Sequence, residues 1–230
     1  MAIEARLLPV EPIYLKSLRD HVHDLLRAAI VGGRLKAGEK LNERRLALEL
    51  GISTTPLKEA LRALEVEGLV RSEARKGIYV TFSATQAEEM MLARAALESM
   101  IARQAAKRVT PPDVAVMRGF LKEMRAALAA VDVERLITLN EDFHDAIHQT
   151  SGCPYLRRLQ GGQRMYDHAA RLSILSDEPE RVRSVEEHEA IADAIAQNLP
   201  DEAERLMRDH VIRSGERHIR LAFGAAQPEE

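Results

Sequence analysis

The sequence is poor in aromatic residues and in cysteine. Aromatic residues make up 3 % of the 230 residues and tryptophan is absent, whereas hydrophobic residues make up 46 %. A core built from aliphatic side chains favours packed helices over a β sandwich, which needs aromatic and β-branched residues. The single cysteine, Cys153, excludes an internal disulfide and a cysteine-rich zinc ribbon.

Two further absences concern membranes and export. No apolar stretch approaches the roughly 18 residues that a membrane helix needs. The first residues, Met1 to Arg6, include an early acid and no compact apolar segment, unlike a signal peptide. We therefore expect a soluble, cytoplasmic protein with no membrane partner.

The net charge of −3 conceals two unequal parts. Residues 1–83 carry a net charge of +3 and the remainder −6, and six of the eight histidines lie in the second part. A basic segment joined to an acidic one points weakly to nucleic-acid binding by the first segment alone.

Residues 12–83 are predicted to form a small winged helix-turn-helix domain. Apolar residues recur at three- and four-residue steps from Leu15 to Ile30, which is the spacing of an amphipathic helix. Asn42 is a suitable N-cap for a second helix that ends before Gly51. A third helix begins near Thr55, so only a short turn separates the two.

Two short strand-like stretches follow the third helix. Residues 69–72 and 78–81 are predicted to be strands, and residues 73–77 form the hairpin between them. A helix, a helix-turn-helix unit and a hairpin together describe a winged helix. In such a domain the N-terminal end of the third helix meets DNA, and here that end carries hydroxyls and a lysine.

The same segment resembles the GntR family of bacterial transcription regulators. The resemblance rests on residues 33–43 (GRLKAGEKLNE), 46–61 (LALELGISTTPLKEAL) and 64–70 (LEVEGLV). It implies that the following residues contact operator DNA: Arg44, Ser53, Thr54, Thr55, Lys58, Lys76 and Gly77. Thr54 and Lys58 stand where the family commonly has arginine. Because neither grips guanine as arginine does, we expect an operator that differs from the family's commonest sequence.

Residues 84–222 are predicted to form an antiparallel bundle of six helices, with seven as the alternative. Proline, glycine and capping residues interrupt a helical apolar pattern at residues 110–113, at Asp132, and at residues 151–154, 177–179 and 198–201. The fourth helix is expected to reach about Leu175. The fold class is therefore mainly α, with the winged helix first and the bundle second.

Histidines of the second segment are spaced to meet inside such a bundle. Asn140 and His144 are four residues apart and therefore lie on one helix face. His188 lies about as far before the turn at residues 199–200 as His210 lies after it, so antiparallel helices bring both imidazoles to the same height. Three imidazoles and a side-chain oxygen are suited to a transition metal.

The second segment also resembles a known domain, the effector domain of the FadR group in this family and its VanR-like branch. Residues 94–98, 140–144, 151–152 and 188–191 carry the resemblance. It implies a divalent transition metal, with zinc preferred over nickel or manganese, held by Asn140, His144, His188 and His210. Asn140 replaces the commoner aspartate, which predicts weaker metal retention. His148 is a rival ligand.

By the same resemblance, a small organic acid completes the coordination of the metal. Arg94 and, less strongly, Arg164 are the candidate partners of its carboxylate. The sequence thus predicts a homodimeric regulator whose binding to palindromic operator DNA is controlled by a small carboxylate effector. Two alternatives stay open: a regulator that senses the metal itself, and a three-histidine metalloenzyme, which the winged helix disfavours.

Overall fold

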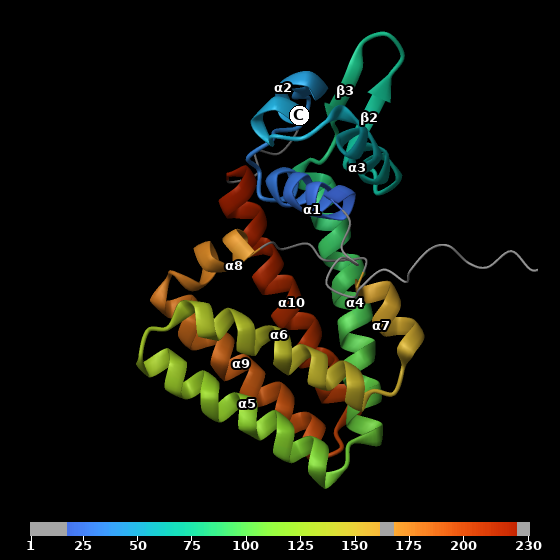
Figure 1. Ribbon diagram of the computed structural model, residues 1–230. Helices are drawn as coiled ribbons and strands as arrows, with labels where there is room; N and C mark the ends of the chain where they lie inside the picture. Colours follow the sequence, from blue (N-terminus) through green and yellow to red (C-terminus); the bar gives the residue numbers. More distant parts are fainter. Residues whose placement is uncertain (1–17, 162–167, 225–230) are drawn as a thin grey trace, which may run out of the picture. The chain divides into compact units, whose positions relative to one another are not determined.

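The computed structural model describes residues 18–161 and 168–224. The chain divides into two compact units that meet between Phe82 and Ser83, and each is considered by itself. Figure 1 shows the helices and strands of both units, coloured along the sequence.

The first unit combines short helices with a small antiparallel sheet. Its described elements are α1 (Leu18–Val31), β1 (Lys40–Leu41), α2 (Glu43–Glu49), α3 (Thr54–Val66), β2 (Val70–Glu73) and β3 (Gly77–Val80). The strands lie in the order β1-β3-β2, with Leu41 opposite Ile78 and Val70 opposite Val80. The hairpin of β2 and β3 is the predicted wing. Strand β1 was not predicted, because two residues are too few to show an alternating pattern.

The helix-turn-helix forms where local signals place it. The Asn42 side chain accepts a hydrogen bond from the backbone N–H of Arg45 (3.0 Å) and so caps α2. Gly51 follows α2 with a φ of +65°, a conformation that favours glycine at the end of a helix. The turn is therefore short, and α3 starts at Thr54.

Helix α3 packs against α1 through a narrow apolar stripe. The four residues of α3 that are buried are Leu57, Ala60, Leu61 and Leu64, which recur at helical spacing. On α1 the buried residues are Val22, Leu26, Ile30 and Val31. The charged and hydroxyl-bearing side chains of α3 are left on its opposite face.

The second unit is helical throughout its described residues. Its elements are α4 (Ala84–Arg108), α5 (Pro111–Ala129), α6 (Val133–Thr150), α7 (Pro154–Gly161), α8 (His168–Leu175), α9 (Glu178–Ala196) and α10 (Pro200–Phe223). Side-chain caps start several of them. Ser83 accepts from the N–H of Gln86 (3.4 Å) at α4, and Asp132 accepts from the N–H of Arg135 (3.0 Å) at α6.

The core of this unit lies between two groups of helices. Helices α4 and α10 run alongside one another, and α5 packs against both α6 and α9 (Figure 1). Helix α4 also contacts α6 and α9. Ile101, Phe143 and Met207 are fully buried where these helices meet. Such burial of aliphatic and aromatic side chains is the main stabilising contribution to the bundle.

The predicted fold class, mainly α with a winged helix first, is confirmed. One helix differs from its prediction. The fourth predicted helix is described as two segments, α7 and α8, on either side of residues 162–167, which lie outside the described part of the chain. Within the described residues, no helix has the length and apolarity needed to span a membrane.

Candidate functional site

The residues predicted to contact DNA lie on the surface of the first unit. Arg44 is on α2, Lys58 is on α3 and Lys76 is in the wing, and all three are exposed. Ser53, Thr54 and Thr55, at the start of α3, are also exposed. These side chains are therefore open to a partner.

The cationic groups of this surface are held only by weak ion pairs. Lys58 Nζ lies 3.7 Å from Glu43 Oε2, and Lys76 Nζ lies 3.2 Å from Glu73 Oε2. Both lysines are more than half exposed, and exposed pairs contribute little to stability. Each lysine can exchange its carboxylate for a DNA phosphate.

Gly77 allows the wing to turn. Its φ is +116°, and a Cβ at this position would lie 2.9 Å from Cε of Lys40. This backbone conformation favours glycine, whereas the end of the exposed Lys40 side chain could move aside. Gly77 therefore acts through the shape of the wing, next to the exposed Lys76.

Three histidines of the second unit meet at one point. His144 comes from α6, His188 from α9 and His210 from α10, and one ring nitrogen of each lies within 4.8 Å of the others. Their ring centroids are 4.6 to 5.5 Å apart. All three side chains are buried. The structure thus brings together the three imidazoles that the helical spacing pointed to.

His188 sits deepest in this histidine cluster. It is 1 % exposed and packs against the ring of Phe143, with centroids 4.9 Å apart. Neither of its ring nitrogens has a hydrogen-bond partner among the described residues. Buried polar atoms are normally satisfied, so a group left in this state is suited to binding a ligand.

The buried imidazoles favour their neutral form, which is the form that binds metals. Burial lowers the pKa of His144 to about 4, although the nearby Glu98 carboxylate acts in the opposite direction. Burial and the neighbouring His210 and His144 hold the pKa of His188 well below its ordinary value. At neutral pH both rings are uncharged.

Carboxylates lie near two of the three rings, on the side of their Nδ1 atoms. His210 Nδ1 lies 2.7 Å from Glu187 Oε2, and His144 Nδ1 lies 3.6 Å from Glu98 Oε2. A carboxylate near one ring nitrogen orients an imidazole and leaves the other nitrogen for a metal. Nε2 of His210 is the nitrogen left in this way, whereas Nδ1 of His144 has no hydrogen-bond partner among the described residues.

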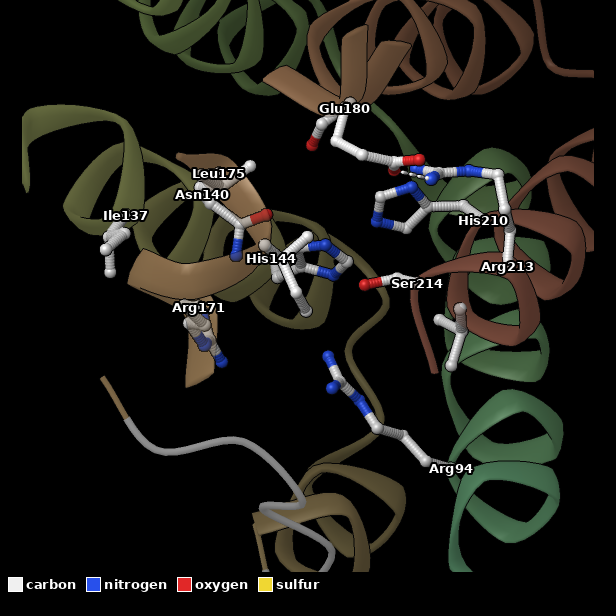
Figure 2. A pocket seen from close by; sticks show the side chains of 13 residues that line it. Arg94, Ile137, Asn140, His144, Arg171, Leu175, Glu180, His210, Arg213 and Ser214 are labelled. Carbon is white, nitrogen blue, oxygen red and sulfur yellow. Dashed lines mark hydrogen bonds and ion pairs between the residues drawn. The ribbon is translucent and has the colours of Figure 1, made fainter. Parts of the chain in front are cut away.

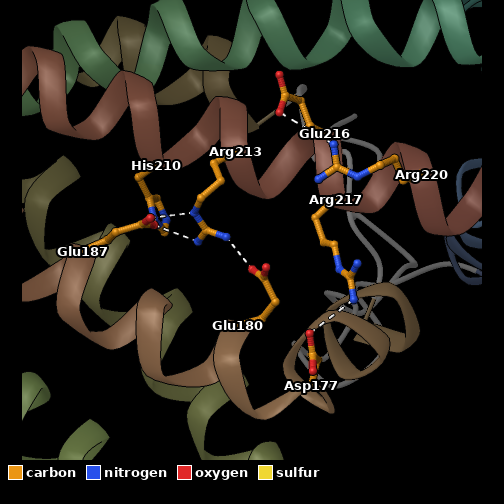
Figure 3. A network of polar contacts seen from close by, with 8 residues as sticks. All are labelled: Asp177, Glu180, Glu187, His210, Arg213, Glu216, Arg217 and Arg220. Atoms are coloured by element: carbon orange, nitrogen blue, oxygen red, sulfur yellow. Dashed lines mark hydrogen bonds and ion pairs between the residues drawn. The ribbon is translucent and has the colours of Figure 1, made fainter. Parts of the chain in front are cut away.

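Glu187 belongs to the polar network between α9 and α10 that Figure 3 shows. Arg213 donates to both oxygens of Glu187, at 2.5 Å and 2.7 Å, and also to Glu180. Burial alone would raise the pKa of Glu187, but hydrogen bonds from His210 and Arg213 lower it. Glu187 is therefore an ionised carboxylate that accepts a hydrogen bond from the N–H of His210 Nδ1.

A second buried group centres on Glu98, which is fully buried on α4. His148 Nε2 lies 2.7 Å from Glu98 Oε2, and Gln160 Nε2 donates to Glu98 Oε1 (2.8 Å). Burial would raise the pKa of Glu98, yet the two histidines and Arg94 hold it well below its usual value. His148, the rival ligand, is thus directed at Glu98. The sequence analysis assigned no role to Glu98.

A cavity opens beside the histidine cluster (Figure 2). We call this the histidine cavity, and its polar lining includes Arg94, Asn140, His144, Arg171, His210 and Arg213. Asn140, the predicted oxygen ligand, is half-buried and lies one turn before His144.

The two candidate effector arginines have different outcomes. Arg94 lines the histidine cavity and is 8 % exposed, with its Nε 3.5 Å from Glu98 Oε1. Arg164 lies outside the described residues. The structure adds Arg171 of α8 and Arg213 of α10 to the lining. Neither has a spacing pattern that marks it as different from a surface arginine, so no signal along the chain pointed to them.

Comparison with known proteins identifies the two units. Residues 18–80 match the bacterial regulatory proteins of the gntR family, and residues 89–213 match the FCD domain. The chain belongs to the GntR family. Its second unit is the FCD domain of such a regulator.

Individual relatives agree with this assignment. The Nta operon transcriptional regulator of Aminobacter aminovorans is 29 % identical over 196 residues, which are 85 % of this chain and 91 % of that one. McbR of Escherichia coli K12 is 33 % identical over 141 residues, 61 % of this chain and 64 % of that protein. The solved structure of E. coli McbR/YncC has the same fold, with a TM-score of 0.62 at 24 % identity over 86 % of this chain and 94 % of that one.

These relatives are regulators of transcription. The prediction that the chain is a regulator and not an enzyme is confirmed, and the metalloenzyme alternative is set aside.

Proposed function

We propose that this regulator binds palindromic operator DNA as a homodimer. Its affinity for that DNA changes when a small organic acid binds at a divalent metal in the FCD domain. The observation that carries the proposal is the histidine cluster: three buried imidazoles that converge and, on His188, two nitrogens without a hydrogen-bond partner among the described residues.

The residues present fit such a metal. His144, His188 and His210 would supply nitrogen, and Asn140 would supply a side-chain oxygen from the same cavity wall. Nitrogen and oxygen donors of this kind suit zinc, nickel or manganese. The bound ion would attract the carboxylate of an effector, while Glu187 holds the His210 ring in place.

The effector would enter the histidine cavity. Arg94 faces this cavity and can pair with a carboxylate that also reaches the metal. On the DNA side, Arg44, Lys58 and Lys76 would neutralise phosphates or read bases. Ser53, Thr54, Thr55 and Gly77 would complete that surface.

The metal is tested by elemental analysis of the full chain after chelation and resupply of zinc. We expect close to one ion per chain in the wild type and a loss of stoichiometric binding in His188→Ala. His23→Ala, in the first unit, is the matched control and should keep the ion. His148→Gln should also keep it, because His148 is directed at Glu98. Equal metal in wild type and His188→Ala would refute the ligand assignment.

The regulation is tested by fluorescence anisotropy with an operator selected from random duplex DNA. Metal and organic acids are titrated separately. We expect an acid to change the affinity for DNA only when the metal is bound. If the metal alone produced the whole change, the chain would be a metal-sensing regulator instead.

A further inference from the structure

The histidine cavity has a second cationic wall that the proposed function leaves without a role. Arg171, from α8, lines the cavity together with Arg94 from α4, and both also line an adjoining hollow beside Glu98 and Glu141. Figure 2 shows the two guanidinium groups at different places around the cavity, Arg94 below His144 and Arg171 near Asn140. Two separate positive groups thus face one small volume.

The two arginines differ in how firmly their acidic partners are held. Arg94 pairs with Glu98, which is fully buried and also bound by His148 and Gln160. Arg171 Nη1 lies 3.2 Å from Glu141 Oε1, and the Glu141 side chain is 60 % exposed. Water screens the attraction at the Glu141 end of this pair, because that side chain is mostly exposed.

This difference makes the partner of Arg171 replaceable. The Arg171 side chain is only 19 % exposed, so a ligand carboxylate beside it would be better shielded from water than Glu141 is. A charged hydrogen bond is stronger where water is excluded. A carboxylate inside the cavity would therefore displace Glu141 and pair with Arg171.

Arg213 does not compete for this role. Its guanidinium already donates to Glu187 and Glu180, two partly buried carboxylates of α9 (Figure 3). These bonds hold Glu187 against His210, so Arg213 serves the histidine cluster and not an incoming acid.

We infer that the effector is a dicarboxylate. This inference rests on the proposed function only for the place of the first carboxylate. One carboxylate would lie at the histidine cluster with Arg94, and the second would pair with Arg171. Ile137 and Leu175 also line the cavity and offer an apolar surface to a short saturated spacer. A monocarboxylate would leave Arg171 with Glu141 and gain only the first interaction.

The test compares acids of equal carbon number by calorimetry on the zinc-loaded full chain. Malonate, succinate and glutarate are measured against propionate, butyrate and valerate. We expect at least one diacid to bind about tenfold or more tightly than its monoacid, since a hydrogen-bonded charge pair contributes at least that much. Arg171→Gln should remove this preference and change monoacid binding less than about twofold.

Matched variants separate the role of Arg171 from general effects of charge. Arg118→Gln, on α5 and paired with Asp193, removes an arginine that does not line the histidine cavity and should keep the diacid preference. Glu141→Gln removes the competing carboxylate and should strengthen diacid binding.

The outcomes distinguish this inference from the proposed function. If no diacid binds more tightly than its monoacid, or if the preference survives in Arg171→Gln, the inference is overturned while the metal assignment stands. If elemental analysis finds no metal, the proposed function fails, and the diacid contrast is still read in the same calorimetry on the metal-free chain. A preference that disappears only in Arg171→Gln supports the inference in either case.

Discussion

Glu187 Oε2 lies 2.7 Å from His210 Nδ1, and this contact determines which nitrogen of His210 faces the other histidines as an acceptor. Because Glu187 is ionised, Nδ1 must carry the proton, and the lone pair is on Nε2. The same carboxylate is clamped by Arg213. A ring fixed in this way is already oriented for the metal that we propose.

The first prediction follows from this contact. Glu187→Gln keeps the size of the side chain but replaces the carboxylate by an amide. The His210 ring is then held less firmly, and its ligand nitrogen becomes less basic. We expect zinc affinity to fall about 10- to 100-fold in a competition titration with a chelator. Glu189→Gln, on the same helix and paired with Arg125, is the control and should match the wild type. Equal loss in both variants would contradict the role of Glu187.

The second prediction concerns the uncharged member of the ligand set. Asn140 lines the histidine cavity beside His144. Asn140→Asp adds a negative charge next to the proposed ion and should raise zinc affinity on the order of tenfold, about 1.4 kcal/mol. The same competition titration measures it. Unchanged or weaker binding would show that position 140 lies outside the coordination of the metal.

The third prediction concerns DNA. Arg44→Ala and Lys58→Ala should each weaken binding to a selected operator by about 1–3 kcal/mol if the side chain reads a base. A lost phosphate contact should instead lower the salt dependence of binding by about one released ion. Arg205→Ala, an exposed arginine of the second unit, is the control. Wild-type affinity in both variants would refute the assignment of these contacts.

The fourth prediction is a pH dependence of the metal-free protein. The folded-state pKa of His144 is about 4, whereas in the unfolded chain it is about 6.5. Between pH 6.5 and pH 4, His144 is protonated in the unfolded state but stays neutral in the folded state. Stability is therefore complete above pH 6.5 and falls as the pH approaches 4, by roughly 3 kcal/mol for this residue.

Thermal unfolding in the presence of a chelator measures this dependence. His144→Gln, which cannot titrate, should flatten the decline between pH 6.5 and 4. Zinc should restore stability, because it binds the neutral imidazoles of the folded state only. A metal-free protein whose stability rose over this range as the pH fell would contradict the burial of a neutral ring.

The fifth prediction compares two glycines. Gly77→Ala places a side chain at a φ of +116°, a conformation that strains any residue other than glycine, while the flexible end of Lys40 can move away from the new Cβ. We expect the first unit to lose about 1–3 kcal/mol of stability and DNA binding to weaken. Gly119, inside α5, has open space around its missing Cβ. Gly119→Ala should stabilise the chain by about 0.5–1 kcal/mol, as measured by denaturant unfolding.

The winged helix was predictable because its signals are local. The Asn42 cap, the Gly51 turn and the stripe from Leu57 to Leu64 each act within a few residues, and the structure uses all of them. Strand β1 escaped prediction because Lys40 and Leu41 become a strand only by pairing with β3.

The histidine cluster was partly predictable for the same reason. Helical spacing relates Asn140 to His144, and the turn before α10 relates His188 to His210. The partners behind the rings were not predictable. Glu98 lies on α4 and reaches His148 on α6, a pairing set by how the helices pack. No periodic pattern along the chain encodes it.

The bare nitrogens of His188 have a consequence for how the sequence can change. A fully enclosed ring with two unsatisfied polar atoms weakens the folded chain, at about 1–3 kcal/mol for each such atom. An aliphatic or phenyl side chain packed on Phe143 would serve the fold better. Random substitution screened for heat resistance alone should therefore replace this histidine. Under the proposed function, the stabilised variants would bind DNA without responding to the effector.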